Sequence, residues 1–175
     1  LRSWRDGWRH LRFMLLYSPS WLFLYPGMLL MLIGLLVGMW LMPGPRHVNG
    51  IFFDIHTLLY AAMAIVIGLQ AVIFAAFTKT FAISEGLLPE DYRWNQLLRS
   101  IRLEVGLIVG ASLLIVGFAG SVYAFDTWQI LKFGPLNPVR TLRIVIPAAT
   151  LLVVGSQIIL SSFFLSILRL KRRSV

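Results

Sequence analysis

The residues best suited to chemistry are arginines at helical spacing near the start of the chain. Arg5, Arg9 and Arg12 fall at positions i, i+4 and i+7, so a helix would align them in one stripe beside tryptophans. A guanidinium group makes paired hydrogen bonds to phosphate oxygens, and tryptophan rings favour the depth of lipid head groups. Residues 1–20 therefore predict a juxtamembrane amphipathic segment that contacts anionic head groups.

Residues 89–102 predict a second amphipathic helix at the membrane interface. Pro89 fits a first helical turn, and apolar residues repeat at i, i+3, i+4 and i+7 from Trp94. Three arginines accompany these apolar residues: Arg93, Arg99 and Arg102. We expect all six arginines to edge a site for a lipid phosphate or head group. The alternative, generic attraction to head groups and the setting of topology, needs the same residues.

Motifs for covalent chemistry are missing from the sequence. It contains no Walker glycine loop, HExxH, GxSxG or Asp-x-Asp, and it has no cysteine. His47, Asp54 and His56 are of metal-ligand type, but a structural zinc site needs four ligands and the sequence offers no clear fourth. We therefore expect no catalytic residue, no cofactor-binding residue and no metal ligand in this segment.

Two glutamines stand out inside otherwise apolar runs. Gln70 and Gln157 lie at similar depths in the second and fourth runs, which are expected to cross the membrane in the same direction. We expect an interhelical hydrogen bond between them, an interaction that contributes about 0.6 to 2 kcal/mol in membranes. The functional alternative is a polar track for a substrate.

The composition is that of an integral membrane protein. Hydrophobic residues make up 58% of the chain, charged residues 13%, and the mean hydropathy is +0.81. Four runs of about 20 or more apolar residues are long enough to cross a hydrocarbon core of about 30 Å: residues 21–42, 57–77, 103–125 and 144–168. Two runs hold a GxxxG pair, which favours close helix contact: Gly34 with Gly38, and Gly106 with Gly110.

These runs predict an all-α integral membrane fold. We expect a membrane domain over residues 21–168, a four-helix bundle of transmembrane spans, with two cytoplasmic interfacial amphipathic helices and a basic tail over residues 169–175. No internal repeat is evident in the sequence.

The basic residues indicate the orientation. Twelve of the 16 lysines and arginines precede the first run, separate the second from the third, or follow the fourth. The positive-inside bias then places both termini in the cytoplasm, for a multi-pass protein of the cell's inner membrane. The formal charge of +9 follows from this pattern, so we expect membrane lipids rather than nucleic acid as partners.

Four stretches carry a family resemblance: SWRDGWRHLRFMLLYSPSWLFLYPG, FDIHTLLYA, EGLLPED and FGPLNPVRTLRIVIPAATLLVVGSQIILSSFFLSILRLKR. Together they resemble the membrane-spanning C-terminal part of bacterial family-two glycosyltransferases related to dolichol-phosphate mannose synthase. The resemblance implies an upstream cytoplasmic catalytic domain of the GT-A type, where a divalent metal is expected. That domain would transfer a sugar from a nucleotide sugar to a polyprenyl phosphate. This segment would anchor the enzyme and present the lipid acceptor.

Two other functions stay open. One is a small four-span protein that moves or escorts lipid-linked sugars without being an enzyme. The other is an assembly anchor whose spans pack with a partner or with a second copy, which includes a homo-oligomer. Because the chain starts at Leu1, we expect a segment of a longer protein or a processed form, and the upstream reading frame distinguishes these alternatives.

Overall fold

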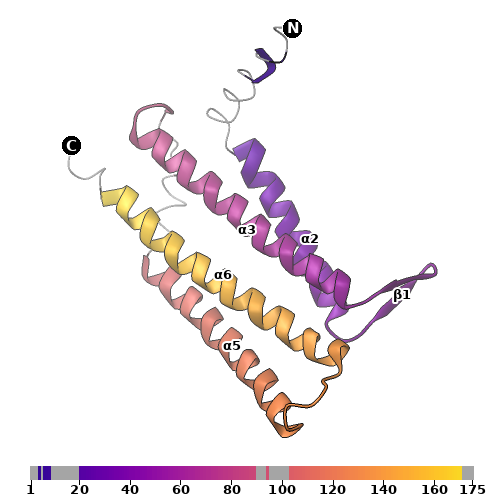
Figure 1. Ribbon diagram of the computed structural model, residues 1–175. Coiled ribbons are helices and arrows are strands. Elements are labelled where there is room, and N and C mark those ends of the chain that lie inside the picture. The colour runs from indigo at the N-terminus through magenta and orange to yellow at the C-terminus, as the bar shows by residue number, and fades with distance from the viewer. Residues whose placement is uncertain (1–3, 5, 9–19, 90–93, 95–102, 171–175) are drawn as a thin grey trace.

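The computed structural model describes residues 4, 6–8, 20–89, 94 and 103–170, which are mostly helical (Figure 1). A π-helical turn, η1 (Ser20–Leu24), leads into α2 (Tyr25–Leu41), and the other long helices are α3 (Ile55–Ser84), α5 (Leu103–Ile130) and α6 (Pro138–Leu170). Four helical segments are long and apolar enough to cross a bilayer: Trp21–Leu41, Ile55–Ser84, Leu103–Ile130 and Pro138–Leu168. The predicted all-α membrane fold is confirmed, and the chain is a multi-pass membrane protein.

Helix α6 begins before its predicted span because Asn137 caps it. The side-chain Oδ1 of Asn137 accepts hydrogen bonds from the backbone N–H groups of Val139, at 3.1 Å, and Arg140, at 3.3 Å. Pro138 occupies the first helical position, where the missing N–H leaves no hydrogen bond unmade. Helix α3 likewise extends beyond its predicted span, to Ser84. Apolar length finds the part of a helix inside the bilayer but not the polar turns that continue it.

The connection from α2 to α3 is a short β-hairpin. Strand β1 (Arg46–Val48) pairs antiparallel with β2 (Ile51–Phe53). Asn49 and Gly50 join them with φ angles of 49° and 80°. A two-residue hairpin turn of type I′ needs such left-handed values at both positions, and Asn-Gly is its preferred sequence.

The four long helices form a row of two hairpins. Helix α2 packs along α3, and α5 packs along α6, while the main contact between the hairpins is α3 against α6 (Figure 1). Helices α2 and α5 therefore lie at the outer edges, and the predicted bundle takes an open form. Many large apolar side chains are exposed on this row, among them Leu29, Phe118 and Leu160. Lipid tails solvate such side chains, so their exposure fits a membrane protein.

Glycine brings the two helices of each hairpin into backbone contact. A Cβ atom on Gly27 would lie 2.8 Å from the carbonyl oxygen of Gly68, and one on Gly68 would lie 2.6 Å from that of Gly27. In the second hairpin, Gly110 and Gly155 stand in the same relation, with both separations 2.8 Å. Since these values are shorter than real Cβ contacts, a larger residue at any of the four positions would push the helices apart.

The glycine pairs singled out in the sequence contribute unequally. An added Cβ on Gly34 would lie 2.6 Å from the carbonyl oxygen of Ala61, whereas one on Gly38 would meet nothing within 4 Å. Both glycines of the α5 pair face α6. Helix α2 therefore contacts α3 through Gly27 and Gly34, which are seven residues apart, and not through both glycines of the GxxxG pair.

The two hairpins repeat each other at these contacts. Glycines of the first helices recur 83 positions apart, and small residues of the second helices recur 87 positions apart. The corresponding residues are Gly27 and Gly110, Gly34 and Gly117, Ala61 and Ala148, and Gly68 and Gly155. Gly117 meets the carbonyl oxygen of Ala148 as Gly34 meets that of Ala61. The sequence shows no evident repeat, but the two hairpins match at these contact positions.

Candidate functional site

The arginines predicted to bind lipid phosphate precede α2 and α5 in the sequence. The six residues themselves lie outside the described part of the chain: Arg5, Arg9, Arg12, Arg93, Arg99 and Arg102. The helices alternate in direction, so the start of α2, the end of α3, the start of α5 and the end of α6 lie together (Figure 1). We call this the basic end, because twelve of the 16 lysines and arginines lie next to it in the sequence.

Lys79 and Trp94 are described residues of the basic end. The Nζ atom of Lys79 lies 4.6 Å from the ring centroid of Trp94, which is a cation–π contact. Trp94 is only 9% exposed and packs with Ile83 of α3, while Leu165 of α6 packs against the same cluster. Apart from Pro89 and Trp94, the predicted interfacial helix over residues 89–102 lies outside the described residues. Trp94, the first apolar residue of the predicted amphipathic repeat, thus packs against α3 and α6.

The structure brings Gln70 and Gln157 together across the contact of α3 with α6. The Nε2 atom of Gln157 donates a hydrogen bond to Oε1 of Gln70 at 2.8 Å. Oε1 of Gln157 is buried, without a hydrogen-bond partner in the described part of the chain. About two turns closer to the basic end, the rings of Phe77 and Phe164 meet with centroids 4.6 Å apart. An amide pair and an aromatic pair thus join the two hairpins.

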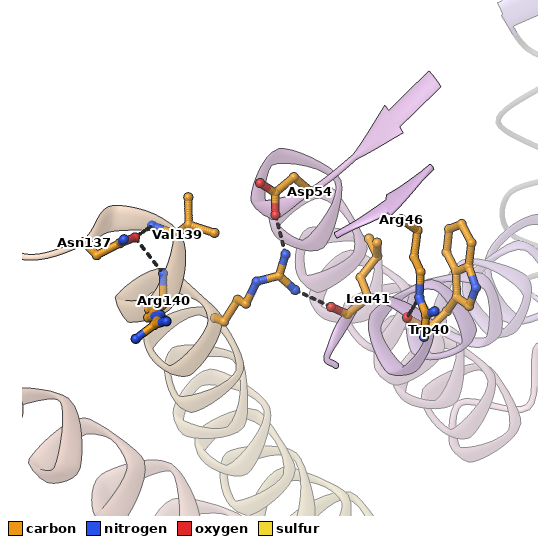
Figure 2. A network of polar contacts seen from close by, with 8 residues as sticks. Trp40, Leu41, Arg46, Asp54, Asn137, Val139 and Arg140 are labelled. Carbon is orange, nitrogen blue, oxygen red and sulfur yellow. Dashed lines mark hydrogen bonds and ion pairs between the residues drawn. The ribbon is translucent and has the colours of Figure 1, made fainter. Parts of the chain in front are cut away.

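At the opposite end of the row, Arg143 of α6 ties three helices together (Figure 2). Its Nη2 forms an ion pair with the carboxylate of Asp54, the residue before α3, and its Nη1 donates to the carbonyl oxygen of Leu41, the last residue of α2, at 2.5 Å. The side chains of Arg143 and Asp54 are 13% and 16% exposed. Leu41 is fully buried against Leu58 and Ile146 beside this ion pair. A cation at a helix C-terminus is also favoured by the helix dipole.

Sequence reasoning missed this ion pair. Arg143 stands just before the fourth predicted run, and Asp54 was considered only with His47 and His56, as a residue of metal-ligand type. The sequence did contain a sign of it. An arginine near the start of an apolar run is costly in the membrane and needs a partner at the same depth. Asp54 is the carboxylate next to the start of α3, at that end of the row.

Reactive groups do not converge elsewhere in the described part of the chain. Thr80 and Ser162 each donate to a carbonyl four residues back in their own helix, at 2.7 Å. The ring of His47 lies against that of a phenylalanine in the facing strand in a tilted arrangement, with centroids 4.8 Å apart. Over the described ranges, no three His, Cys, Asp or Glu side chains are placed to hold a metal ion. The polar contacts found in these ranges hold helices together.

Comparison with known proteins places this architecture in a family. Residues 76–169, more than half of the chain, match the glycosyltransferase family 2 C-terminal transmembrane region. The match runs from the later part of α3 through α5 and almost all of α6. No solved structure is significantly similar to the chain.

A relative of known name agrees with this match. The chain is 35% identical over 166 residues to the low-salt glycan biosynthesis hexosyltransferase Agl6 of Haloferax volcanii. The aligned region covers 94% of this chain but 39% of the relative, so the chain spans well under half of that protein's length. The match over α3, α5 and α6 and this alignment agree with the resemblance seen in the sequence. The chain belongs to the family of C-terminal transmembrane regions of family 2 glycosyltransferases.

Proposed function

We propose that this chain is the membrane domain of an enzyme that transfers a sugar from a nucleotide sugar to a polyprenyl phosphate. Membership of the glycosyltransferase family supports the transferase role. The name of the Haloferax relative, a hexosyltransferase of glycan biosynthesis, favours a hexose as the sugar. In this proposal the chain anchors the catalytic domain and presents the lipid acceptor, while any divalent metal is bound by the catalytic domain.

The observation that carries this proposal is that four helix ends lie together, and that most basic residues stand next to these ends in the sequence. A polyprenyl phosphate keeps its phosphate at the membrane surface and its tail among the lipid chains. Each basic residue near an anionic surface contributes about 1 kcal/mol, and arginine adds paired hydrogen bonds to phosphate. Arginines from the segments before α2 and before α5 would then flank the phosphate, on the cytoplasmic side where a nucleotide sugar is available.

Lys79 and Trp94 support the same arrangement within the described residues. Trp94 belongs to the segment that carries Arg93 and Arg99, and it is buried against α3 and α6. Its docking keeps the start of this arginine-bearing segment close to the helix row. The cation–π contact holds the charge of Lys79 beside it. The basic end would thus offer an acceptor phosphate several cations from different parts of the chain.

The test measures acceptor binding by the full-length protein that contains this chain, reconstituted in phosphatidylcholine vesicles. The variant combines Arg5→Gln, Arg9→Gln and Arg12→Gln. Three charges at about 1 kcal/mol each would weaken binding by up to about 100-fold. We therefore expect the Kd for a polyprenyl phosphate to rise at least about tenfold.

The matched control neutralises three cations of the opposite end: Arg46→Gln, Lys132→Gln and Arg140→Gln. It should leave the Kd unchanged. The same titrations with phosphatidylglycerol separate an acceptor site from a general preference for anionic lipid. Equal losses for both lipids, or weaker membrane retention at an unchanged Kd, would contradict the acceptor site and favour the attraction of head groups in general.

A further inference from the structure

The contact between α3 and α6 joins each residue to its own counterpart. Gln70 and Gln157 are 87 positions apart in the sequence, and they share a hydrogen bond. Phe77 and Phe164 are also 87 positions apart, and their rings are in contact. The same interval relates the small residues through which α3 contacts α2 and α6 contacts α5. The same pairing of positions, 87 residues apart, therefore describes how α3 and α6 contact each other and how each contacts the other helix of its own hairpin.

Such self-matching contacts have a simple geometric cause. Helices α3 and α6 run in the same direction, toward the basic end (Figure 1). When two parallel elements are related by a two-fold axis along their length, residues on the axis touch their own copies. The same axis would exchange α2 with α5, and these two helices do occupy the two outer edges of the row. Membrane proteins with parallel repeats have an axis of this kind along the membrane normal.

We propose that α2–α3 and α5–α6 are two copies of one hairpin module, related by a pseudo-two-fold axis along the membrane normal. The face of α3 with Gln70 and Phe77 is then a self-complementary interaction surface, and its partner is a second copy of the module. In this chain α6 supplies that copy. Each module also follows an arginine-bearing segment, one with Arg5 to Arg12 and the other with Arg93 to Arg102.

The residues shared by the two modules lie where this symmetry needs them. With the interval of 87, the identical residues of α3 and α6 are Ala61, Ala62, Val66, Gly68, Gln70 and Phe77 with their counterparts. Four of the six take part in the helix contacts described above. Gly68 meets Met31 of α2, and its counterpart Gly155 meets Leu114 of α5, 83 positions after Met31. Lipid-facing positions need only be apolar, so they have diverged.

One contact breaks the symmetry. At the interval of 87, Arg143 corresponds to His56 and Asp54 corresponds to Thr141. The ion pair of Arg143 with Asp54 thus has no second copy. It joins the two modules at the end of the row away from the basic end. At that end the two modules also differ in how their helices are connected: a β-hairpin joins α2 to α3, whereas the segment between α5 and α6 leads into the capped start of α6.

The decisive experiment exchanges the contact-bearing segments within the full chain. Residues 61–77 and 148–164 are interchanged, which returns Ala, Gly, Gln and Phe to the same positions. If the modules are equivalent, the exchanged protein folds and melts cooperatively in detergent, with a Tm lowered by the repacking of unlike neighbours around the conserved contacts.

The matched control exchanges residues 61–77 with residues 149–165, one position out of register and without moving a proline. This slip turns the glycine and glutamine about 100° around the helix, away from their contacts. We expect this control to aggregate or to lose cooperative melting. If the in-register exchange fails as completely as the slipped exchange, the two modules are not equivalent and the proposal is overturned.

Disulfide cross-linking reads the register without exchanging segments. The chain has no cysteine, so any cross-link within it must join the two introduced cysteines. Gln70→Cys with Gln157→Cys, and Phe77→Cys with Phe164→Cys, should each cross-link within the monomer through a short bis-methanethiosulfonate reagent, which forms a disulfide with each thiol and spans the gap left by the shortened side chains. The mixed pair Gln70→Cys with Phe164→Cys should not, because its positions differ by about 10 Å along the axis. Efficient cross-linking of the mixed pair would also overturn the proposal. This inference does not depend on the proposed acceptor.

Discussion

A few polar side chains make the contacts that join the helices of this membrane domain. Arg143 lies in the first turns of α6 and would be costly in the membrane alone, but Asp54 and the carbonyl oxygen of Leu41 satisfy it. The sequence supplied the charge but not its partner, because Asp54 is 89 positions away and the partner depends on which hairpins meet. In contrast, the pairing of Gln70 with Gln157 was foreseeable, since two isolated amides at one depth have few other partners.

At this scale we predict that Arg143→Gln lowers the free energy of unfolding by about 3 kcal/mol, because it leaves the Asp54 carboxylate without its partner. This corresponds to a fall in Tm of about 6 to 12 °C in a detergent melt followed by circular dichroism. The double variant Arg143→Gln with Asp54→Asn should regain a large part of that loss. If the double variant is as unstable as the sum of the two single variants, the residues are not coupled.

The glutamine pair gives a second prediction for single residues. Gln70→Ala with Gln157→Ala should lower Tm by a few degrees, in line with the loss of about 0.6 to 2 kcal/mol. Ser156→Ala is the control, because that hydroxyl is exposed and donates to its own helix at 2.8 Å. Loss of sugar transfer in the double variant at an unchanged Tm would instead favour the polar track for a substrate.

Helices and strands were predictable to different degrees. The spans followed from apolar length alone, because a bilayer admits few other solutions for such runs. The β-hairpin between α2 and α3 was not predicted, although Asn49–Gly50 marks its turn, because its two strands have only three residues each. The glycine spacing was identified in α5 but not fully in α2, since a sequence pattern does not reveal which face meets a neighbour.

The glycines of α2 and α3 allow a sharp comparison between residues of one type. Gly68→Ala should lower the free energy of unfolding by about 1 to 3 kcal/mol, because the new Cβ would lie 2.6 Å from the carbonyl oxygen of Gly27. Gly38→Ala should be neutral or stabilising, since its Cβ meets nothing within 4 Å and alanine favours helix. Equal effects of the two substitutions on Tm would show that α2 does not pack on α3 as described.

For the whole molecule, hydropathy and charge predicted the number of spans and the end at which basic residues gather. They did not predict the order of helices in the row, because apolar length permits a crossing without choosing neighbours. The repeat was also hidden, since the modules agree mainly at contact positions. The six arginines at the basic end lie outside the described residues, so their role as an acceptor site remains a proposal.

The orientation can be tested on the complete protein with single cysteines introduced in the described loops, after any cysteine outside this cysteine-free chain has been replaced. We predict that Asn49→Cys reacts with a membrane-impermeant maleimide in intact cells, because the β-hairpin lies away from the basic end. Glu85→Cys, next to the end of α3, should react only after permeabilisation. The opposite pattern would place the basic end outside the cell and would contradict a cytoplasmic catalytic face.

The open row of helices also bears on how an isoprenoid acceptor would be chosen. A sheet of helices one layer thick presents a broad wall to the hydrocarbon, rather than a tube with a closed bottom. A tail lying along such a wall meets mostly apolar side chains, and any units beyond the bilayer's thickness would curl among lipids. Discrimination between acceptors should therefore fall on the charged head and the first few isoprene units, with tolerance for tails of different length.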